Sequence, residues 1–353
     1  MGADTKQSRR LLDLPAPTAA RAVALGFLDV AQDACRRLRA DGDEEALHDF
    51  RVALRRLRST LRAYRPWINN SVIPRKLRRR LKRLARATGS ARDAEIGIAW
   101  LRQRRRRLDN RERIGCDHLV AELHKHMDKA YAEIRRDVVE QFRVLDKRLR
   151  SALQRRANAG FAPLYGPATA QLVREHVAEL EERLKKIESI DDTEEIHEAR
   201  IAAKRLRYLI EPMARTLPRA RKPLEALKTF QDELGELCDR QVMSAELIEA
   251  AGRYHAQRAT RKVEFALHQG SSRAARMPNV LPGLLTLAEH AGVERKRRLQ
   301  QIERRYLGRH IAPFLAPFRD LAEYLSKHRT VESRKTVATT RQSESAALAR
   351  RAV

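Results

Sequence analysis

Apolar residues recur along most of the chain at the three- and four-residue spacing of one face of an α-helix. The clearest case lies between Glu45 and Trp67, where this face comprises Leu47, Phe50, Leu54, Leu57, Leu61 and Tyr64. Similar segments precede and follow it, separated by short turns that contain glycine, proline or aspartate. The pattern predicts a succession of amphipathic helices.

A neighbouring face of the 45–67 helix is entirely basic. At 100° per residue, this first basic stripe comprises His48, Arg51, Arg55, Arg58 and Arg62. Surface helices usually alternate charges that attract, and like charges at this spacing repel by a few tenths of a kcal/mol per pair. Because the stripe contains no carboxylate, it predicts a polyanionic partner.

The same arrangement of basic residues on one helical face occurs a second time, 149 residues further on. The second basic stripe comprises His197, Arg200, Lys204 and Arg207, in the segment EIHEARIAAKRLRYLIEP. Both copies follow the pattern His-x-x-Arg-x-x-x-basic-Arg-x-Arg, and the apolar positions around them also match. Two copies in register indicate an internal repeat.

A third basic stripe lies on the helix that Pro74 opens, beside an apolar face formed by Leu77, Leu81, Leu84 and Thr88. It comprises Arg75, Arg78, Lys82 and Arg86. In the second half, at an offset of 146, Arg221 and Lys228 correspond to Arg75 and Lys82. Asp232 replaces Arg86, and Glu211 replaces Arg62, so the second repeat carries fewer cations.

The spacing of these segments predicts five parts. Residues 1–17 form a polar leader, 18–157 a first helical bundle, 158–167 a linker with two glycines and two prolines, 168–328 a second bundle, and 329–353 a disordered tail. We expect helices to end near Gly89 and Gly235, and one long helix to run from Arg113 to Arg156.

Composition agrees with an all-α protein that binds an anion. The 353 residues carry a net charge of +28, only 14 glycines and 13 prolines, and 5% aromatic residues. Cys35, Cys116 and Cys238 are isolated, which predicts neither disulfides nor a zinc site and fits a reducing cytoplasm. No signal peptide and no apolar run of about 18 residues is found, so we expect no membrane partner.

The two stripes and their surroundings resemble the CHAD family, the conserved histidine α-helical domain. The resemblance rests on LHDFRVALRRLRSTL and IHEARIAAKRLRYLI, each followed by an LK-x6-Gly-x3-Asp segment, and it covers roughly residues 18–328. It implies two pseudo-symmetric four-helix-type bundles of antiparallel helices whose basic faces line a central groove or pore. It also implies binding of inorganic polyphosphate, often at polyphosphate granules in bacteria. The family is sometimes fused to a CYTH triphosphatase domain, and the Glu-x-Glu-x-Lys strand typical of that domain is not found in this sequence.

The chemistry of the stripes suits such a ligand. A guanidinium group can donate hydrogen bonds to two phosphate oxygens at once, and it stays charged at any working pH. Successive stripe residues repeat about every 5 Å along a helix, so one helix can meet several phosphates. The predicted polyphosphate-binding residues are His48, Arg51, Arg55, Arg58, Arg62, Arg75, Arg78, Lys82, Arg86, His197, Arg200, Lys204, Arg207, Arg221 and Lys228.

Several residues have a second interpretation. His48 and His197 either donate to phosphate or bond to neighbouring groups at the start of a helix. Arg56 and Arg205 lie off the stripes and are expected at the edge of the core, and the run from Arg104 to Arg107 is expected in solvent. Asp93 and Asp239 are expected to cap helices or to pair with a stripe arginine.

The main alternative function is nucleic-acid binding, which the charge supports. However, the sequence has no helix-turn-helix signature and no aromatic residues interleaved for stacking on single strands. An enzyme acting on phosphoanhydrides is not expected, because the first stripe offers no carboxylate to hold Mg²⁺ and the chain lacks a GxxxxGK[ST] phosphate loop. No catalytic residue, cofactor or metal site is predicted.

Overall fold

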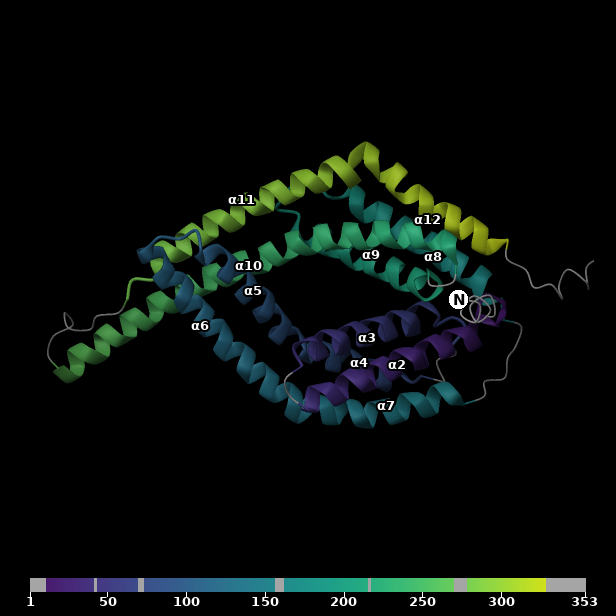
Figure 1. The fold of residues 1–353 in the computed structure, drawn as a ribbon, viewed down its shortest axis with the longest axis horizontal. Helices are drawn as coiled ribbons and strands as arrows, with labels where there is room; N and C mark the ends of the chain where they lie inside the picture. Colours follow the sequence, from purple (N-terminus) through teal and green to yellow (C-terminus); the bar gives the residue numbers. More distant parts are fainter. Residues whose placement is uncertain are drawn as a thin grey trace, which may run out of the picture.

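The computed structural model describes residues 11–40, 43–68, 73–155, 162–214, 217–269 and 278–327. Within these ranges the regular elements are helices (Figure 1). One isolated β-bridge joins Pro15 and Leu164. The structure confirms the all-α class. The helices are α2 (Ala16–Ala40), α3 (Glu44–Ala63), α4 (Arg75–Ala87), α5 (Gly89–Arg105), α6 (Asn110–Glu133), η1 (a π-helix, Ile134–Val138), α7 (Val139–Gln154), α8 (Tyr165–Lys185), α9 (Thr193–Ala214), α10 (Pro218–Gln269), α11 (Leu281–Tyr306), η3 (Gly308–His310) and α12 (Ile311–Ser326).

The larger of two apolar cores runs through both halves of the chain. It is built by α2, α3, α4 and α7 on one side and by α8, α9, α12 and the first half of α10 on the other. Phe50 of α3 packs edge-to-face on Phe142 of α7 with ring centroids 5.0 Å apart, and Phe230 of α10 makes similar contacts with Tyr306 and Phe314. This core holds the two helices that carry the first and second basic stripes.

A second core lies at the other end of the molecule, where helices from the two halves mix (Figure 1). It is formed by α5 and α6 together with the later part of α10 and the start of α11. Gly115 of α6 and Gly283 of α11 lie where these two helices cross, and their Cα atoms are close enough that neither position has room for a side chain.

The segment predicted as a linker does not separate two independent cores. Its described residues lead into α8, whose first residue, Tyr165, is buried and stacks on Tyr64 with ring centroids 5.0 Å apart. The Tyr64 hydroxyl bonds to Thr169 Oγ1 at 2.6 Å, and the Tyr165 amide donates to Leu14 O at 2.8 Å. The two halves therefore belong to one folded unit. The predicted two-fold relation between two bundles stays a prediction, and the tail at 329–353 lies outside the described residues.

One predicted helix end is wrong, because α10 continues through Gly235 to Gln269. The helix expected from Arg113 to Arg156 is present as α6, η1 and α7, with a π-helical turn inside it. In the first half α4 ends at Ala87 with Thr88 as its C-cap, because the Thr88 carbonyl accepts a bond from the Arg51 guanidinium and its Oγ1 donates to Ala85 O at 2.9 Å. Leu234 takes this position in α10 and is fully buried, so it offers no such polar alternative and the helix goes on.

Candidate anion-binding site

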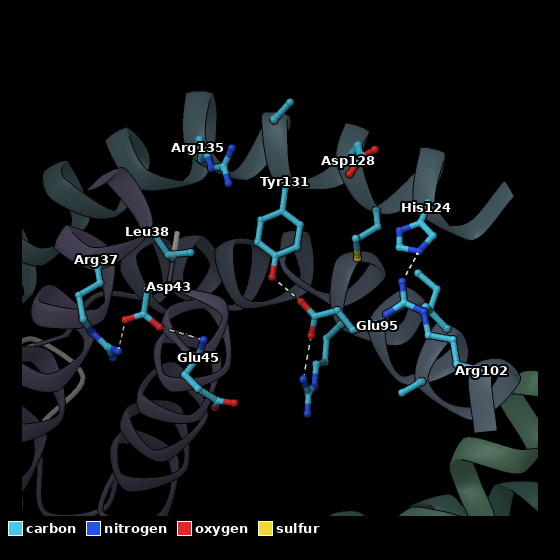
Figure 2. Close-up of a pocket in the computed structure, with 15 residues that line it drawn as sticks. Arg37, Leu38, Asp43, Glu45, Glu95, Arg102, His124, Asp128, Tyr131 and Arg135 are labelled. Atoms are coloured by element: carbon cyan, nitrogen blue, oxygen red, sulfur yellow. Dashed lines mark hydrogen bonds and ion pairs between the residues drawn. The ribbon is translucent and has the colours of Figure 1, made fainter. Parts of the chain in front are cut away.

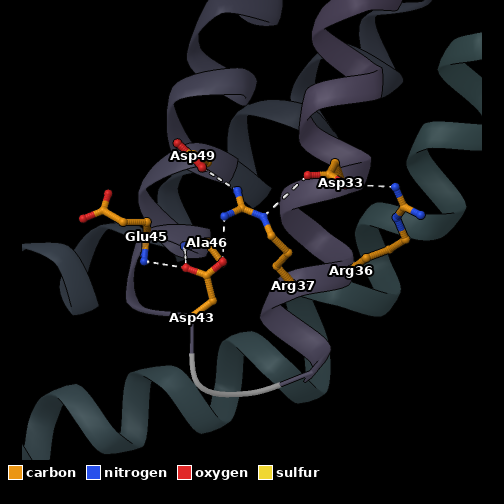
Figure 3. A network of polar contacts seen from close by, with 7 residues as sticks. All are labelled: Asp33, Arg36, Arg37, Asp43, Glu45, Ala46 and Asp49. Atoms are coloured by element: carbon orange, nitrogen blue, oxygen red, sulfur yellow. Dashed lines mark hydrogen bonds and ion pairs between the residues drawn. The ribbon is translucent and has the colours of Figure 1, made fainter.

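The N-terminal end of α3 is fixed by a network of charges (Figure 3). Asp43 caps the helix by accepting the amides of Glu45 at 2.9 Å and Ala46 at 3.2 Å. Arg37 of α2 donates to Asp43 Oδ2 at 2.7 Å and also pairs with Asp49. The guanidinium lowers the pKa of the Asp43 carboxyl, which therefore stays charged. This network sets the rotation of α3 and hence the direction of the first basic stripe.

The first and second basic stripes lie side by side, because α3 and α9 pack directly against each other. Burial lowers the pKa of Lys204 to about 7, and the nearby positive charges of Arg200 and Arg55 add to this shift. Burial likewise lowers the pKa of Arg51, Arg58 and Arg62. The structure thus brings the two stripes together and partly removes their cations from water.

The contacts that α3 and α9 make, with each other and with α5 and α10, come in matched pairs. Arg56 forms an ion pair with Glu211, and the corresponding residues, Arg205 and Arg62, also lie near each other. Arg51 lies over Gly89, and Arg200 lies over Gly235, each with guanidinium nitrogens about 4 Å from where a Cβ would be. This is the pattern that an internal two-fold axis would produce.

Cations of the two stripes lack carboxylate partners, whereas cations elsewhere find them. Within the described residues, no salt bridge includes Arg51, Arg55, Arg58, Arg62, Arg200, Lys204 or Arg207. In Arg55, Arg200 and Arg207 the buried Nε has no hydrogen-bond partner in the part of the chain described. Arg51 donates to Thr88 O, and Arg207 donates to Gln231 at 2.9 Å, so these contacts orient the head groups without neutralising them.

Off-stripe arginines behave in the opposite way, and one prediction about them is corrected, for Arg104 within the run from Arg104 to Arg107. Arg56 pairs with Glu211 and Arg205 with Glu179, so both are held by ion pairs. Arg104 is not solvated: its side chain is 15% exposed, pairs with Glu294 and lies 5.9 Å from the centroid of the Trp100 ring. Within the described residues, carboxylates therefore form salt bridges with arginines outside the two stripes and form none with the stripe cations.

Of the third stripe and its second-half counterparts, Arg221 and Lys228, only some residues lie near the first two stripes. Arg86 lies close enough to Arg58 for its charge to lower the pKa of that residue. Arg78 donates to Ile73 O at 2.7 Å, and Arg221 donates to Ala214 O at 3.3 Å, so both tie down local backbone. Arg75 and Lys82 are exposed.

The second-half counterpart of Lys82 is also engaged locally. Lys228 pairs with Glu225 at 2.7 Å, one turn earlier on α10. The second half therefore offers fewer available cations outside its own stripe.

The two histidines differ in their surroundings. His48 is half-buried, and burial together with the charges of Arg92 and Arg55 lowers its pKa. His197 is exposed. The free protein thus holds His48 as a neutral imidazole at neutral pH, next to cations that a bound anion would offset.

Sequence reasoning missed the role of Arg92, and of the two roles it offered for Asp93 and Asp239 it is wrong about helix capping, while Asp93 does lie near Arg51. Arg92 of α5 lies near both His48 and Arg51, and it pairs with Glu95 at 2.7 Å. Asp93 and Asp239 do not cap helices; they line one small cavity between α5 and α10. Burial and the facing charge of Asp239 raise the pKa of Asp93, and Arg51 opposes this effect. Their matching positions in the two repeats, 11 residues after Lys82 and Lys228, were the one available signal.

A cavity of about 800 Å³ opens beside the start of the first stripe, between α5, α6 and the ends of α2 and α3 (Figure 2). In it, the Tyr131 hydroxyl donates to Glu95, and Arg102 lies 3.0 Å from His124 Nε2. Four arginines and four carboxylates line it: Arg37, Arg92, Arg102, Arg135, Asp43, Glu45, Glu95 and Asp128. Its charges balance, so it does not extend the stripes as an anion site.

Neither a metal centre nor a membrane span was identified in the described ranges. No group of three or more His, Cys, Asp or Glu side chains there is arranged to hold a metal ion. No helix there is both long and apolar enough to cross a membrane.

The fold and the adjoining stripes define an all-α protein with two repeats of a basic, histidine-led helix. The model of the CHAD domain family matches residues 22–248, and the chain belongs to this family. Among solved structures, the fold is similar to that of the CHAD domain from the plant Ricinus communis, with a TM-score of 0.54 and 23% identity over 90% of this chain and 94% of that one. It is also similar to PptA from Streptomyces chartreusis, with a TM-score of 0.55 and 13% identity over 81% of this chain and 100% of that one. No curated protein sequence matches the chain.

Proposed function

We propose that this protein binds inorganic polyphosphate, without hydrolysing it, along the adjoining basic stripes of α3 and α9. The observation that carries the proposal is that seven stripe cations have no salt-bridge partner among the described residues, on two helices that pack against each other and bring Arg55 close to Lys204. Membership of the CHAD family supports it. The groove or pore between the bundles, the cytoplasmic location and the association with polyphosphate granules belong to the same proposal.

The energetics favour a long, flexible polyanion. Burial of several like charges costs free energy in the free protein, and each phosphate that approaches them recovers part of it. A single exposed ion pair contributes only about 0–1 kcal/mol, so affinity must come from many contacts and from the counterions they release. A chain of phosphates without bases needs no aromatic stacking surface, and none of the stripe positions is Phe, Tyr or Trp.

Substitution within both stripes tests the assignment. The variant Arg55→Gln/Arg58→Gln/Lys204→Gln removes three cations that lack carboxylate partners. We expect its affinity for long-chain polyphosphate to fall about 30-fold, or roughly 2 kcal/mol. Arg106→Gln/Arg107→Gln/Arg111→Gln removes the same charge from exposed residues at the α5–α6 turn and should change affinity less than about twofold by the same exposed-pair magnitude. Equal losses in the two variants would contradict the assigned site.

Competition separates polyphosphate from the nucleic-acid alternative. We expect long-chain polyphosphate to displace duplex DNA at a far lower phosphate concentration than DNA needs to displace polyphosphate. The reverse order would favour nucleic acid. Sustained phosphate release from tripolyphosphate and Mg²⁺ would contradict the non-enzymatic part of the proposal.

A further inference from the structure

A third cavity lies between α4 and α7, away from the α3–α9 stripes. Its volume is about 430 Å³, and its charged lining consists of Lys76, Lys147, Arg148 and Arg155. The remaining lining residues are Pro74, Leu77, Ser151 and Ala152, so no carboxylate takes part. The charge-balanced cavity beside α6 differs in this respect.

The carboxylates of α7 are already used by other arginines. Asp146 accepts from Arg150 at 2.9 Å, and Glu140 pairs with Arg143 at 2.7 Å. Within the described residues, the four cations that line the cavity take part in no salt bridge. They are all exposed, so a ligand can reach them.

Helix α4 presents cations on both flanks of its apolar face. Eight of its thirteen residues are lysine or arginine, and none is acidic. At 100° per residue, the third stripe lies on one flank, and Lys76 lies on the other. α3 packs against α4 on the side of Arg86, and α7 packs near Lys76 and Leu77. Binding at the α3–α9 stripes therefore leaves the charge on the second flank without a ligand.

The geometry points to a second polyphosphate-binding site in the cavity between α4 and α7, lined by Lys76, Lys147, Arg148 and Arg155. Its ligand is a run of phosphate groups, and it deepens the proposed function by giving one molecule two separate contacts with polyphosphate. Cations that neighbour each other on two helices match phosphates that follow one another along a chain. A protein with two such sites can hold a long chain at two points or join two chains.

The variant Lys76→Gln/Lys147→Gln/Arg148→Gln tests this site. For wild type we expect tripolyphosphate to bind at two sites in a calorimetric titration, and we expect the variant to keep only the tighter one. With long-chain polyphosphate, the slope of log affinity against log salt should become shallower by about 2–3, at roughly 0.7–0.9 per lost phosphate contact. The matched Arg106→Gln/Arg107→Gln/Arg111→Gln variant should keep both the stoichiometry and the slope of wild type.

The outcomes separate this site from the proposed function. If the variant keeps the wild-type stoichiometry and slope, the second site is wrong, whatever happens at α3 and α9. If the variant with changes at Arg55, Arg58 and Lys204 retains the tighter tripolyphosphate site, the proposed function is wrong even where the α4–α7 variant loses binding. Circular dichroism of each variant verifies that the helices are intact.

Discussion

At the scale of single residues, Lys204 distinguishes this site from a plain cluster of arginines. It is the one amine in the two stripes, and its lowered pKa of about 7 arises first from burial and then from Arg200 and Arg55. Arg55 on α3, Arg200 on α9, and Cys238 and Asp239 on α10 are the charged and titratable groups around it. A bound phosphate favours the charged amine, so binding above pH 7 requires uptake of a proton.

We therefore predict that polyphosphate affinity depends on pH through Lys204. Affinity should level off well below pH 7, where Lys204 is charged in the free protein, and fall by up to about tenfold per pH unit above pH 7 until the pKa of the bound state is passed. Lys204→Arg stays charged and should remove this fall while keeping the affinity measured at pH 6.5. Binding measured from pH 6.5 to 9 with both proteins tests the prediction, and an unchanged pH profile in Lys204→Arg would contradict it.

Asp93 and Asp239 give a second prediction at this scale. Their carboxylates face each other beside Arg51 and repel an approaching phosphate. Asp93→Asn/Asp239→Asn should raise polyphosphate affinity up to about fivefold, the effect of about 1 kcal/mol from nearby charges. Glu303→Gln/Asp320→Asn, which removes two exposed carboxylates from α11 and α12, serves as the control. Weaker binding by the Asp93/Asp239 variant would show that these carboxylates support the site instead.

At the scale of helices, close packing explains what periodicity could not predict. The 3.6-residue pattern predicts α3, α9 and their stripes, because each helix presents its own apolar and basic faces. The pattern could not show that a helix ends before Thr88 while α10 continues through Leu234. The difference arises because the Arg51 guanidinium, from another helix, binds the Thr88 carbonyl. The crossing of α6 and α11 at Gly115 and Gly283 is equally invisible in a single segment.

This crossing supports a stability prediction. A Cβ added at Gly283 would overlap the carbonyl oxygen of Glu112, which is backbone and cannot move aside. Gly283→Ala should lower the free energy of unfolding by about 2–3 kcal/mol through overpacking. Gly292→Ala, on the same helix with nothing within 4 Å of its added Cβ, should raise it by about 0.5–1 kcal/mol. Chemical denaturation measures both, and equal effects would refute the close crossing.

At the scale of the whole molecule, the two halves are joined by a shared core and by charges that the sequence alone misassigned. Glu211 looked like a lost cation of the second repeat, because it stands where the first repeat has Arg62. In the fold it forms the half-buried ion pair with Arg56 that connects α3 to α9. The two residues of this ion pair are 155 positions apart in the sequence, so a pattern within one segment cannot predict it.

A double-mutant cycle measures this connection. Arg56→Gln and Glu211→Gln should each lower the free energy of unfolding by about 1–3 kcal/mol, because each leaves a half-buried charge unpaired. The double variant should lose less than the sum of the two, with a coupling energy of at least about 0.5 kcal/mol. Additive losses would mean that the pair does not couple the halves.

The central claim is that one polyanion contacts both stripes at once. A crystal structure of the protein with polyphosphate tests it directly. We predict phosphate groups between α3 and α9 that lie within hydrogen-bond distance of Arg55 or Arg58 on one side and of Lys204 or Arg207 on the other. Phosphates bound elsewhere, with no phosphate between α3 and α9, would contradict the account.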